Sequence, residues 1–300
     1  MSMSMQQINE ERLRKRICQF KDDSEYRSLT EYLIRELASG HVPMQLQAKA
    51  YNELGLAHLQ LDEPLEAEKS FLSAIERDPQ AINPKFNLAN LAMYAQRYDQ
   101  AGEMFHEILK MEPSHLGARF HAGLCLAMSD KPDQALPYFE SSAAAAPQAM
   151  GPNFWAAETL VAQKRFREAL PYFRRATEIT PDHRESQRGV AICLLETGQN
   201  EECVEQCDAL ILSGQGAEYL AWQIKGDALI EIGEIEAAAL SHLELADMDF
   251  DARDFLIMRT KELRKEYPHY VSRYAAVIID VIPELEPAFN GICKDSEEEL

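Results

Sequence analysis

Three cysteines near residue 200 have a residue type and spacing that could bind a soft metal ion. Cys203 and Cys207 are four residues apart, which places them on one face of a helix, and Cys193 precedes Cys203 by ten residues. Thiolates are preferred ligands of soft metals. However, no fourth ligand is evident, and a small buried thiol also packs well in an apolar core. We therefore predict that these cysteines are packing residues, and we keep a thiol-based metal or redox sensor as an alternative.

Other familiar chemical motifs are absent from the sequence. It contains no glycine-rich phosphate loop, no H-E-x-x-H, no G-x-S-x-G and no paired C-x-x-C motif. The eight histidines are scattered along the chain, and we expect His58 and His242 to pack in the core. The sequence thus predicts no enzyme activity, no catalytic residue, no metal site and no cofactor.

A constant period, of about 34 residues, is the strongest signal in the chain. It appears in three residue types at once, which chance alone would rarely produce. The repeated prolines are Pro79, Pro113, Pro147 and Pro181; the alanines are Ala67, Ala101, Ala135 and Ala169; the phenylalanines are Phe71, Phe105, Phe139 and Phe173. Cys203 and Cys207 continue the alanine and phenylalanine series. The period predicts a stack of similar structural units.

Residues 82–115 show how one unit is built. NPKFNLANLAMYAQ reads as a first helix and DQAGEMFHEILKME as a second, joined by a short turn at Arg97-Tyr98. The small Ala101 lets the two helices approach closely, and Phe105 lies one turn later on the same face. Pro113 cannot continue the helix, so it ends the unit. Stacking such pairs buries the apolar faces that a single pair would leave exposed.

These positions resemble the tetratricopeptide repeat. Residues 48–81 match it most fully, through Tyr51, Leu54, Gly55, Ala67, Phe71, Ala74 and Pro79. The resemblance implies an all-α fold: a right-handed superhelical solenoid of helix-turn-helix repeats with capping helices at both ends. It extends from residue 48 to residue 252 and is specific for fold, whereas it leaves the function open because the family is defined by packing positions.

The predicted organisation has three parts. Residues 1–43 hold two helices, 8–20 and 24–39, that form an N-terminal cap or a divergent repeat. Residues 44–252 form the array, and residues 253–300 form C-terminal capping helices and an acidic tail. The units of the array are 48–81, 82–115, 116–149, 150–183, 184–217 and, after a one-residue insertion, 219–252. In the last part, residues 270–282 are strongly apolar and either seal the array or dock a partner.

In this family the first helix of each unit lines a concave groove. Carried onto this chain, the groove-facing stripe consists of aromatic, amide and methionine side chains: Asn52, Phe86, Asn87, Asn90, Met93, Phe120, His121, Leu124, Met128, Phe154, Trp155 and Glu158. An asparagine amide both donates and accepts hydrogen bonds, which suits the backbone of an extended peptide. The basic residues near the stripe do not reproduce the carboxylate clamp of chaperone-binding members, so that role is not expected.

The net charge of −20 is concentrated in the last third of the chain. Between Glu196 and Asp251 there are 14 acids and one base, Lys225. Such a surface repels phosphate backbones, so nucleic-acid binding is not expected. It provides solubility, and it also favours a partner with a basic segment. In the later units the stripe itself becomes acidic, through residues such as Glu185, Asp227 and Glu231.

The sequence predicts a cytoplasmic protein-protein interaction scaffold or adaptor that binds a partner polypeptide in the groove. The sequence contains no run of 18 apolar residues, so no membrane span is predicted. The first residues also lack the apolar stretch of a secretion signal. The six cysteines are accordingly expected to be reduced. A self-associating assembly platform that uses residues 270–282 is an alternative, in which the partner is a second copy of the chain.

Overall fold

A computed structural model describes residues 5–214, 219–248 and 252–294. The described residues form seventeen α-helices and two short 3-10 helices, and no strand occurs among them. The structure is therefore an all-α repeat solenoid. Residues 1–4, 215–218, 249–251 and 295–300 lie outside the description, so most of the predicted acidic tail does as well.

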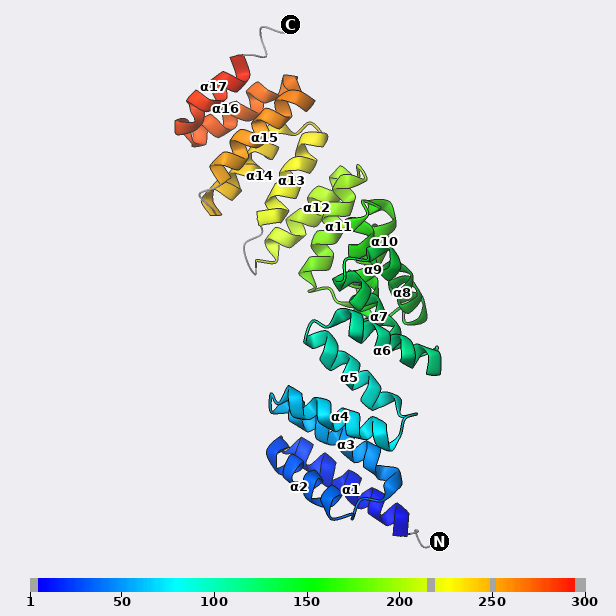
Figure 1. Ribbon diagram of the computed structural model, residues 1–300. Helices are drawn as coiled ribbons and strands as arrows, with labels where there is room; N and C mark the ends of the chain where they lie inside the picture. Colours follow the sequence, from blue (N-terminus) through cyan, green and yellow to red (C-terminus); the bar gives the residue numbers. More distant parts are fainter. Residues whose placement is uncertain (1–4, 215–218, 249–251, 295–300) are drawn as a thin grey trace. The chain divides into compact units, whose positions relative to one another are not determined.

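The helices follow one another in antiparallel pairs (Figure 1). The N-terminal pair is α1 (Met5–Asp22) and α2 (Tyr26–Ala38). The array comprises α3 (Met44–Gln60), α4 (Pro64–Arg77), α5 (Ile82–Tyr94), α6 (Tyr98–Met111), α7 (Leu116–Met128), α8 (Pro132–Ala145), α9 (Met150–Ala162), α10 (Phe166–Ile179), α11 (Arg184–Glu196), α12 (Asn200–Leu212), α13 (Tyr219–Glu231) and α14 (Ile235–Met248). The chain ends with α15 (Ala252–Glu266), η1 (Pro268–Tyr270), α16 (Val271–Val281), η2 (Pro283–Leu285) and α17 (Glu286–Lys294).

The helix starts carry the period of the sequence. From α5 to α11 the first helices begin exactly one sequence period apart, and the second helices from α4 to α12 do the same. The helices α13 and α14 each begin one residue later than this spacing predicts, as the insertion requires. Two compact units divide the chain, Met1–Ala145 and Ala146–Leu300, and each is described by itself below.

A left-handed residue turns the chain between the two helices of each repeat. Asp62, Gln96, Asp130 and Lys164 have φ between 57° and 59°, and Gly198 and Gly233 hold the same place in the last two repeats. The amide after this residue donates to a carbonyl five residues earlier, at 2.9 Å from Glu63 to His58 and likewise in the other five repeats. This is the Schellman end of a helix, which satisfies carbonyls that the helix leaves unpaired.

The turn of the second repeat differs in one respect from the sequence prediction. The sequence predicted a turn at Arg97-Tyr98, whereas Tyr98 is the first residue of α6 and the turn comprises residues 95–97. The left-handed Gln96 gives no glycine signal, which explains the shift of one residue. The same kind of turn joins α1 to α2, where Ser24 has φ of 56° and Glu25 donates to the Phe20 carbonyl at 2.8 Å.

The core of each repeat forms where the periodic phenylalanine meets a small residue. Phe71, Phe105, Phe139 and Phe173 are fully buried, as are the periodic alanines on the same helices. A Cβ on Gly55 would lie 2.5 Å from the Phe71 ring, so glycine is required for this approach. Close packing of the ring between paired helices therefore explains why both the phenylalanine and the small residues recur.

The C-terminal helices pack into one apolar cluster with the last repeat. Val271, Tyr274, Ala275 and Ile278 of α16 are buried there, together with Phe289 of α17. The ion pair of Arg273 with Glu236, at 2.7 Å, joins α16 to α14 on the surface. The apolar face of residues 270–282 is thus turned inward, against the cluster.

A helix must be both long and apolar to cross a bilayer. No helix among the described residues has both properties.

Candidate functional site

Two asparagines join the first helices of consecutive repeats in the N-terminal unit. The Asn87 side-chain amide on α5 donates to Asn52 Oδ1 on α3 at 2.8 Å. Asn52 is 8% exposed and Asn87 is half-buried. The structure therefore brings these two predicted site residues together, and Asn52 acts at least as a support that fixes the amide of Asn87.

Asn90 lies on the same helix as Asn87, one turn further along. Its residue is half-buried, and its Oδ1 atom is buried without a hydrogen-bond partner among the described atoms. Leaving a buried carbonyl oxygen unpaired costs about 1–3 kcal/mol. Asn90 therefore adds a second side-chain amide to the helix face that carries the Asn52–Asn87 pair.

Phe86 and His121 pack around the buried Phe105. The Phe86 ring meets Phe105 edge-on at 5.6 Å and His121 at 5.4 Å, and the His121 ring stacks on Phe105 at 5.3 Å. His121 Nδ1 also lies 2.8 Å from the Gly117 carbonyl oxygen. Burial lowers the pKa of His121, so the ring is neutral near pH 7. These two predicted site residues therefore spend much of their surface on packing.

The remaining predicted residues of the N-terminal unit differ in exposure. Phe120 is half-buried against Phe139 at 5.9 Å, and Met93 packs against the α5–α7 cluster. Leu124 is half-buried as well. Met128, in the last turn of α7, is 44% exposed. Apolar contact for a ligand is thus available mainly at the ends of these helices.

Tyr94 is a surface residue that the sequence reasoning missed. It ends α5, is 87% exposed and follows Met93 directly. It also lies one full sequence period before Met128, so the two exposed side chains hold the same position in consecutive repeats. That equivalence in the period was the signal that could have found it.

The predicted residues of the C-terminal unit form a second aromatic group. Phe154 lies 5.8 Å from Trp155, 6.1 Å from Phe173 and 4.9 Å from His183, as distances between ring centroids. Trp155 is half-buried. Glu158 is half-buried too, and burial raises its pKa, an effect that nearby Arg188 opposes. This group combines an indole with a partly desolvated carboxylate.

Two histidines that the sequence reasoning did not single out position the phenylalanines. His115 and His183 each stand before a first helix and accept a hydrogen bond on Nδ1, from the Ala118 amide at 3.0 Å and the Ser186 amide at 3.2 Å. Their rings rest on Phe86 and Phe154, which lie on the preceding first helices, α5 and α9. A side chain that caps a helix and also packs on an aromatic ring fixes the start of that helix.

The acidic stripe predicted for the last repeats is partly neutralised by the C-terminal helices. Asp227 of α13 pairs with Arg259 of α15 at 2.8 Å, and Glu231 accepts a hydrogen bond from the Tyr267 hydroxyl at 3.0 Å. Burial raises the pKa of Asp227 to about 6, although Arg259 opposes this. Both carboxylates therefore already have partners within the chain.

A buried histidine replaces phenylalanine in the last repeat. His242 Nδ1 lies 2.7 Å from the Tyr274 hydroxyl, and Nε2 lies 3.2 Å from the Gln223 carbonyl oxygen. The carbonyl can only accept, so Nε2 carries the proton and Nδ1 accepts from Tyr274. Burial lowers the pKa of His242 to about 4. The ring thus joins α13, α14 and α16 as a neutral side chain.

The three cysteines of the opening hypothesis are completely buried. Cys203 Sγ donates to the Ala191 carbonyl at 3.3 Å, and burial raises the pKa of Cys193 to about 12. The neighbouring Cys203 and burial also raise the pKa of Cys207. Among the described residues, no group of three or more histidines, cysteines or acids is placed to hold a metal ion. Thiols with raised pKa values are poor nucleophiles, and although the hydrogen bond with Cys207 lowers the pKa of Cys203, that thiol is fully buried, so the geometry favours a packing role.

Three cavities lie away from the predicted stripe. One of about 290 Å³ lies between α1, α2 and the start of α3, and one of about 280 Å³ lies between α6 and α7. A third, of about 270 Å³, lies at the turn between α9 and α10.

Family profiles match the repeats directly. Three profiles described as tetratricopeptide repeat match residues 48–81, 86–149 and 160–223, which together make up more than half of the chain. The chain belongs to the tetratricopeptide repeat family. Membership supports a general role as a protein-interaction scaffold, in a family whose repeats are generally non-catalytic. A comparison with curated proteins finds no match.

Solved structures of tetratricopeptide repeat proteins share the fold. YrrB, described as having an unusual peptide-binding site, is 23% identical with a TM-score of 0.58, over 61% of this chain and 94% of that one. A protein from Parabacteroides merdae is 18% identical with a TM-score of 0.57, over 88% and 99%. MamA from Desulfovibrio magneticus RS-1 is 17% identical with a TM-score of 0.52, over 57% and 98%. At these identities the similarity shows the fold alone.

Proposed function

We propose that this chain is a scaffold that captures an extended polypeptide segment on the first-helix face of its N-terminal unit. The proposed contact surface is the amide face of α5, formed by Asn87 and Asn90, with the exposed side chains at the ends of α5 and α7. The observation that carries the proposal is the buried and unpaired Oδ1 of Asn90 beside the ordered Asn52–Asn87 pair.

A peptide backbone supplies the donor that this surface lacks. An extended segment offers amide N–H groups along its length, and one of them would pair with Asn90 Oδ1 once this side chain turns toward the segment. The free energy that the empty surface loses through an unpaired acceptor would then be recovered on binding. Because Asn52 already holds the Asn87 amide, the surface needs little reordering before it binds.

Apolar side chains beside the amides would provide area and selectivity. Tyr94 and Met128 are exposed at the ends of their helices, and Met93 is half-buried beside Tyr94. Aromatic and methionine side chains are enriched at interfaces because they offer adaptable apolar contact. A peptide with apolar residues flanking its bound backbone would fit this surface. The peptide-binding site named for YrrB indicates that this fold can present one.

A random peptide library displayed on phage can test the proposal without a known partner. Peptides enriched on the wild-type chain would be synthesised, and their dissociation constants measured by fluorescence anisotropy against Asn90→Ala and Asn87→Ala. Loss of a hydrogen bond to a buried group costs about 1–3 kcal/mol, so each variant should bind about 5-fold to 100-fold more weakly.

The matched control is Asn83→Ala, since Asn83 lies on the same helix and is exposed. It should leave the dissociation constant unchanged. The proposal is wrong if no peptide is enriched, or if the enriched peptides bind Asn90→Ala as tightly as the wild-type chain.

We also propose that the chain acts in the cytoplasm and prefers partners with a basic segment. The excess of acids between Glu196 and Asp251 supports this preference. Two of these acids already have partners within the chain, since Asp227 pairs with Arg259 and Glu231 accepts a hydrogen bond from Tyr267. Exposed acids such as Glu201 and Glu205 remain for contact. Binding of this kind would weaken as salt is added, because ions screen exposed charges.

The two alternatives from the sequence receive less support from the geometry. Self-association through residues 270–282 needs an apolar surface that α16 instead buries in its own core. A thiol sensor needs an accessible thiolate, whereas Cys193, Cys203 and Cys207 are fully buried. The peptide-binding scaffold is therefore the function that we favour.

A further inference from the structure

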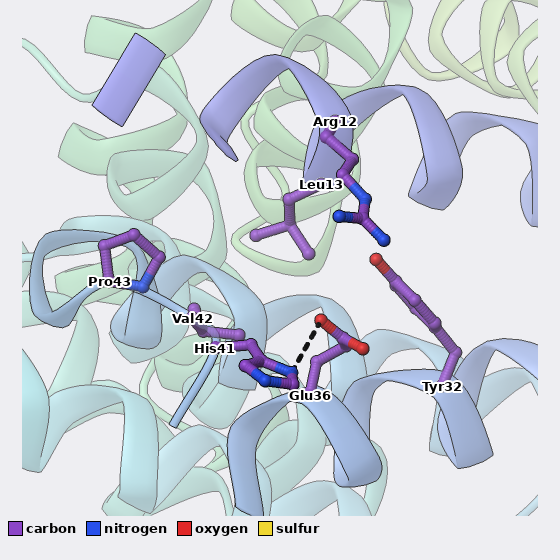
Figure 2. A pocket seen from close by; sticks show the side chains of 7 residues that line it. All are labelled: Arg12, Leu13, Tyr32, Glu36, His41, Val42 and Pro43. Carbon is purple, nitrogen blue, oxygen red and sulfur yellow. Dashed lines mark ion pairs between the residues drawn. The ribbon is translucent and has the colours of Figure 1, made fainter. Parts of the chain in front are cut away.

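The cavity at the N-terminal end is built from groups of opposite charge around an apolar wall. Figure 2 shows Arg12 and Leu13 reaching into it from α1, and Tyr32 and Glu36 from α2. The remaining lining comes from the segment before α3, namely His41, Val42 and Pro43. Its volume of about 290 Å³ is at the lower end of the range for small-molecule sites.

One pole of the cavity is a pair of hydrogen-bond donors. The Arg12 guanidinium is directed toward the Tyr32 hydroxyl (Figure 2). The pKa of Tyr32 is raised, first by burial and then by the Glu36 carboxylate, so the phenol keeps its proton and can donate. Since a guanidinium and a phenol both donate, and the guanidinium is always charged, this pole suits a carboxylate.

The second pole carries a carboxylate, that of Glu36, which lies beside the Arg12–Tyr32 pair in Figure 2. The Glu36 side chain is 23% exposed, and its Oε2 lies 3.8 Å from His41 Nδ1. His41 follows the left-handed Gly40, with φ of 72°, and its Nδ1 lies 2.9 Å from Ser39 Oγ, while its side chain is 69% exposed. A carboxylate at this end would attract an ammonium group.

The rest of the cavity wall is apolar. Leu13 and Val42 are buried members of the N-terminal core cluster, and Pro43 is half-buried before α3. Neither a simple anion nor a simple cation matches all of this lining, because one pole would repel each of them. A small molecule that carries a carboxylate, an ammonium group and an aliphatic side chain matches every part.

We propose that this cavity binds a free α-amino acid with an apolar side chain. The carboxylate lies at Arg12 and Tyr32, the ammonium group at Glu36, and the side chain against Leu13 and Val42. The site is separate from the proposed peptide surface, although residues 41–43 lead directly into α3, which carries Asn52. It places a small-molecule site at the end of the repeat array.

Isothermal titration calorimetry of the full chain with L-leucine at millimolar concentration tests this proposal. Two probes separate the poles: 4-methylpentanoate lacks the ammonium group, and 3-methylbutylamine lacks the carboxylate. Each should bind at least about tenfold more weakly than leucine, the ratio expected for the loss of one charge-assisted hydrogen bond.

Variants locate the binding. Arg12→Gln and Glu36→Gln should each weaken leucine binding about tenfold or more. The matched controls, Arg14→Gln on α1 and Glu31→Gln on α2, change exposed charges outside the cavity and should bind as the wild-type chain does. Circular dichroism of every variant checks that the helices are intact.

Three results would overturn the proposal. The first is the absence of heat with leucine, isoleucine, valine, methionine and phenylalanine alike. The second is equal affinity of the Arg12 and Glu36 variants and the wild-type chain. The third is equal affinity for leucine and either half-molecule. None of these results depends on whether the chain binds a peptide.

Discussion

The central packing position of the repeat is filled differently in the two units of the chain. In the N-terminal unit it is always phenylalanine, at Phe71, Phe105 and Phe139, and each ring is fully buried. The C-terminal unit begins with Phe173 but then uses Cys207 and His242, which are equally buried. The helices that carry this position have nearly the same length in both units and begin at nearly constant spacing.

The difference shows that the backbone of the repeat tolerates several solutions to one packing problem. A phenyl ring has no polar atom, so its burial needs no hydrogen bond. His242 needs hydrogen bonds on both ring nitrogens, because burying an unpaired polar atom costs free energy. It obtains one of them from Tyr274, outside the repeats. The last repeat is therefore completed by the C-terminal helices in a way that the earlier repeats do not require.

Truncation to alanine should destabilise the chain far more at Phe105 than at Cys207. Phe105→Ala should lower the free energy of unfolding by about 3–5 kcal/mol, because it leaves a ring-sized cavity. Cys207→Ala should cost only about 1 kcal/mol, since a thiol buries far less apolar surface. Urea titration followed by circular dichroism measures both, and equal losses would contradict the comparison.

Acid should affect the histidine repeat specifically. The pKa of His242 is about 4 in the folded chain and about 6.5 when unfolded, so the unfolded state binds the proton first. The contribution of neutral His242 is present above pH 6.5 and is lost as the pH falls toward 4. Relative to His242→Phe, the wild-type chain should lose roughly 2 kcal/mol between pH 7 and pH 5.

Comparison with the variant is necessary because Asp227 acts in the opposite direction. Its pKa is raised to about 6, so the folded chain takes up a proton there and gains stability as the pH falls from 6 toward the unfolded value of 3.8. Asp227 Oδ1 also lies 3.5 Å from His242 Nε2, so the two groups are coupled and both chains are compared in an Asp227→Asn background. A difference that does not change with pH would show that His242 titrates normally in the folded chain.

The smallest expected effect concerns the left-handed turn, where the two units again differ. The N-terminal unit uses Asp62, Gln96 and Asp130, whereas the C-terminal unit ends with Gly198 and Gly233. Gln96→Gly should raise the unfolding free energy by up to about 1 kcal/mol, and Gly198→Ala should lower it by about 1 kcal/mol. A Cβ on Gly198 meets no atom within 4 Å, so the second change isolates backbone strain. Thermal unfolding would show shifts of opposite sign.

The period in the sequence was sufficient to predict the helices and their core. Phe105 and Ala101 recur because one ring and one small residue are needed wherever two helices pair, and this requirement acts at a fixed spacing. The candidate stripe followed from the family resemblance, and the structure adds that Asn52 supports Asn87 while Phe86 packs on Phe105. Its binding role stays a prediction, as do the domain boundaries and the cytoplasmic location.

Features that break the period could not be predicted in this way. The pairing of Asp227 with Arg259 depends on a helix outside the repeats, so an acidic stripe read from the sequence appeared more open than it is. The left-handed Gln96 and Lys164 have no glycine to mark them. The pocket of Arg12, Tyr32 and Glu36 forms where α1 and α2 meet the segment before α3, which residue spacing alone does not indicate.

The bonds that tie successive groups of helices together span short, similar stretches of chain. Asn52 and Asn87 are 35 residues apart, His242 and Tyr274 are 32 apart, and Glu231 and Tyr267 are 36 apart. Each contact closes a loop of similar size, so each repeat adds a similar loss of chain entropy when it folds onto its neighbour. Folding can therefore start at any well-packed pair and spread in steps, and local opening of one repeat need not unfold the rest.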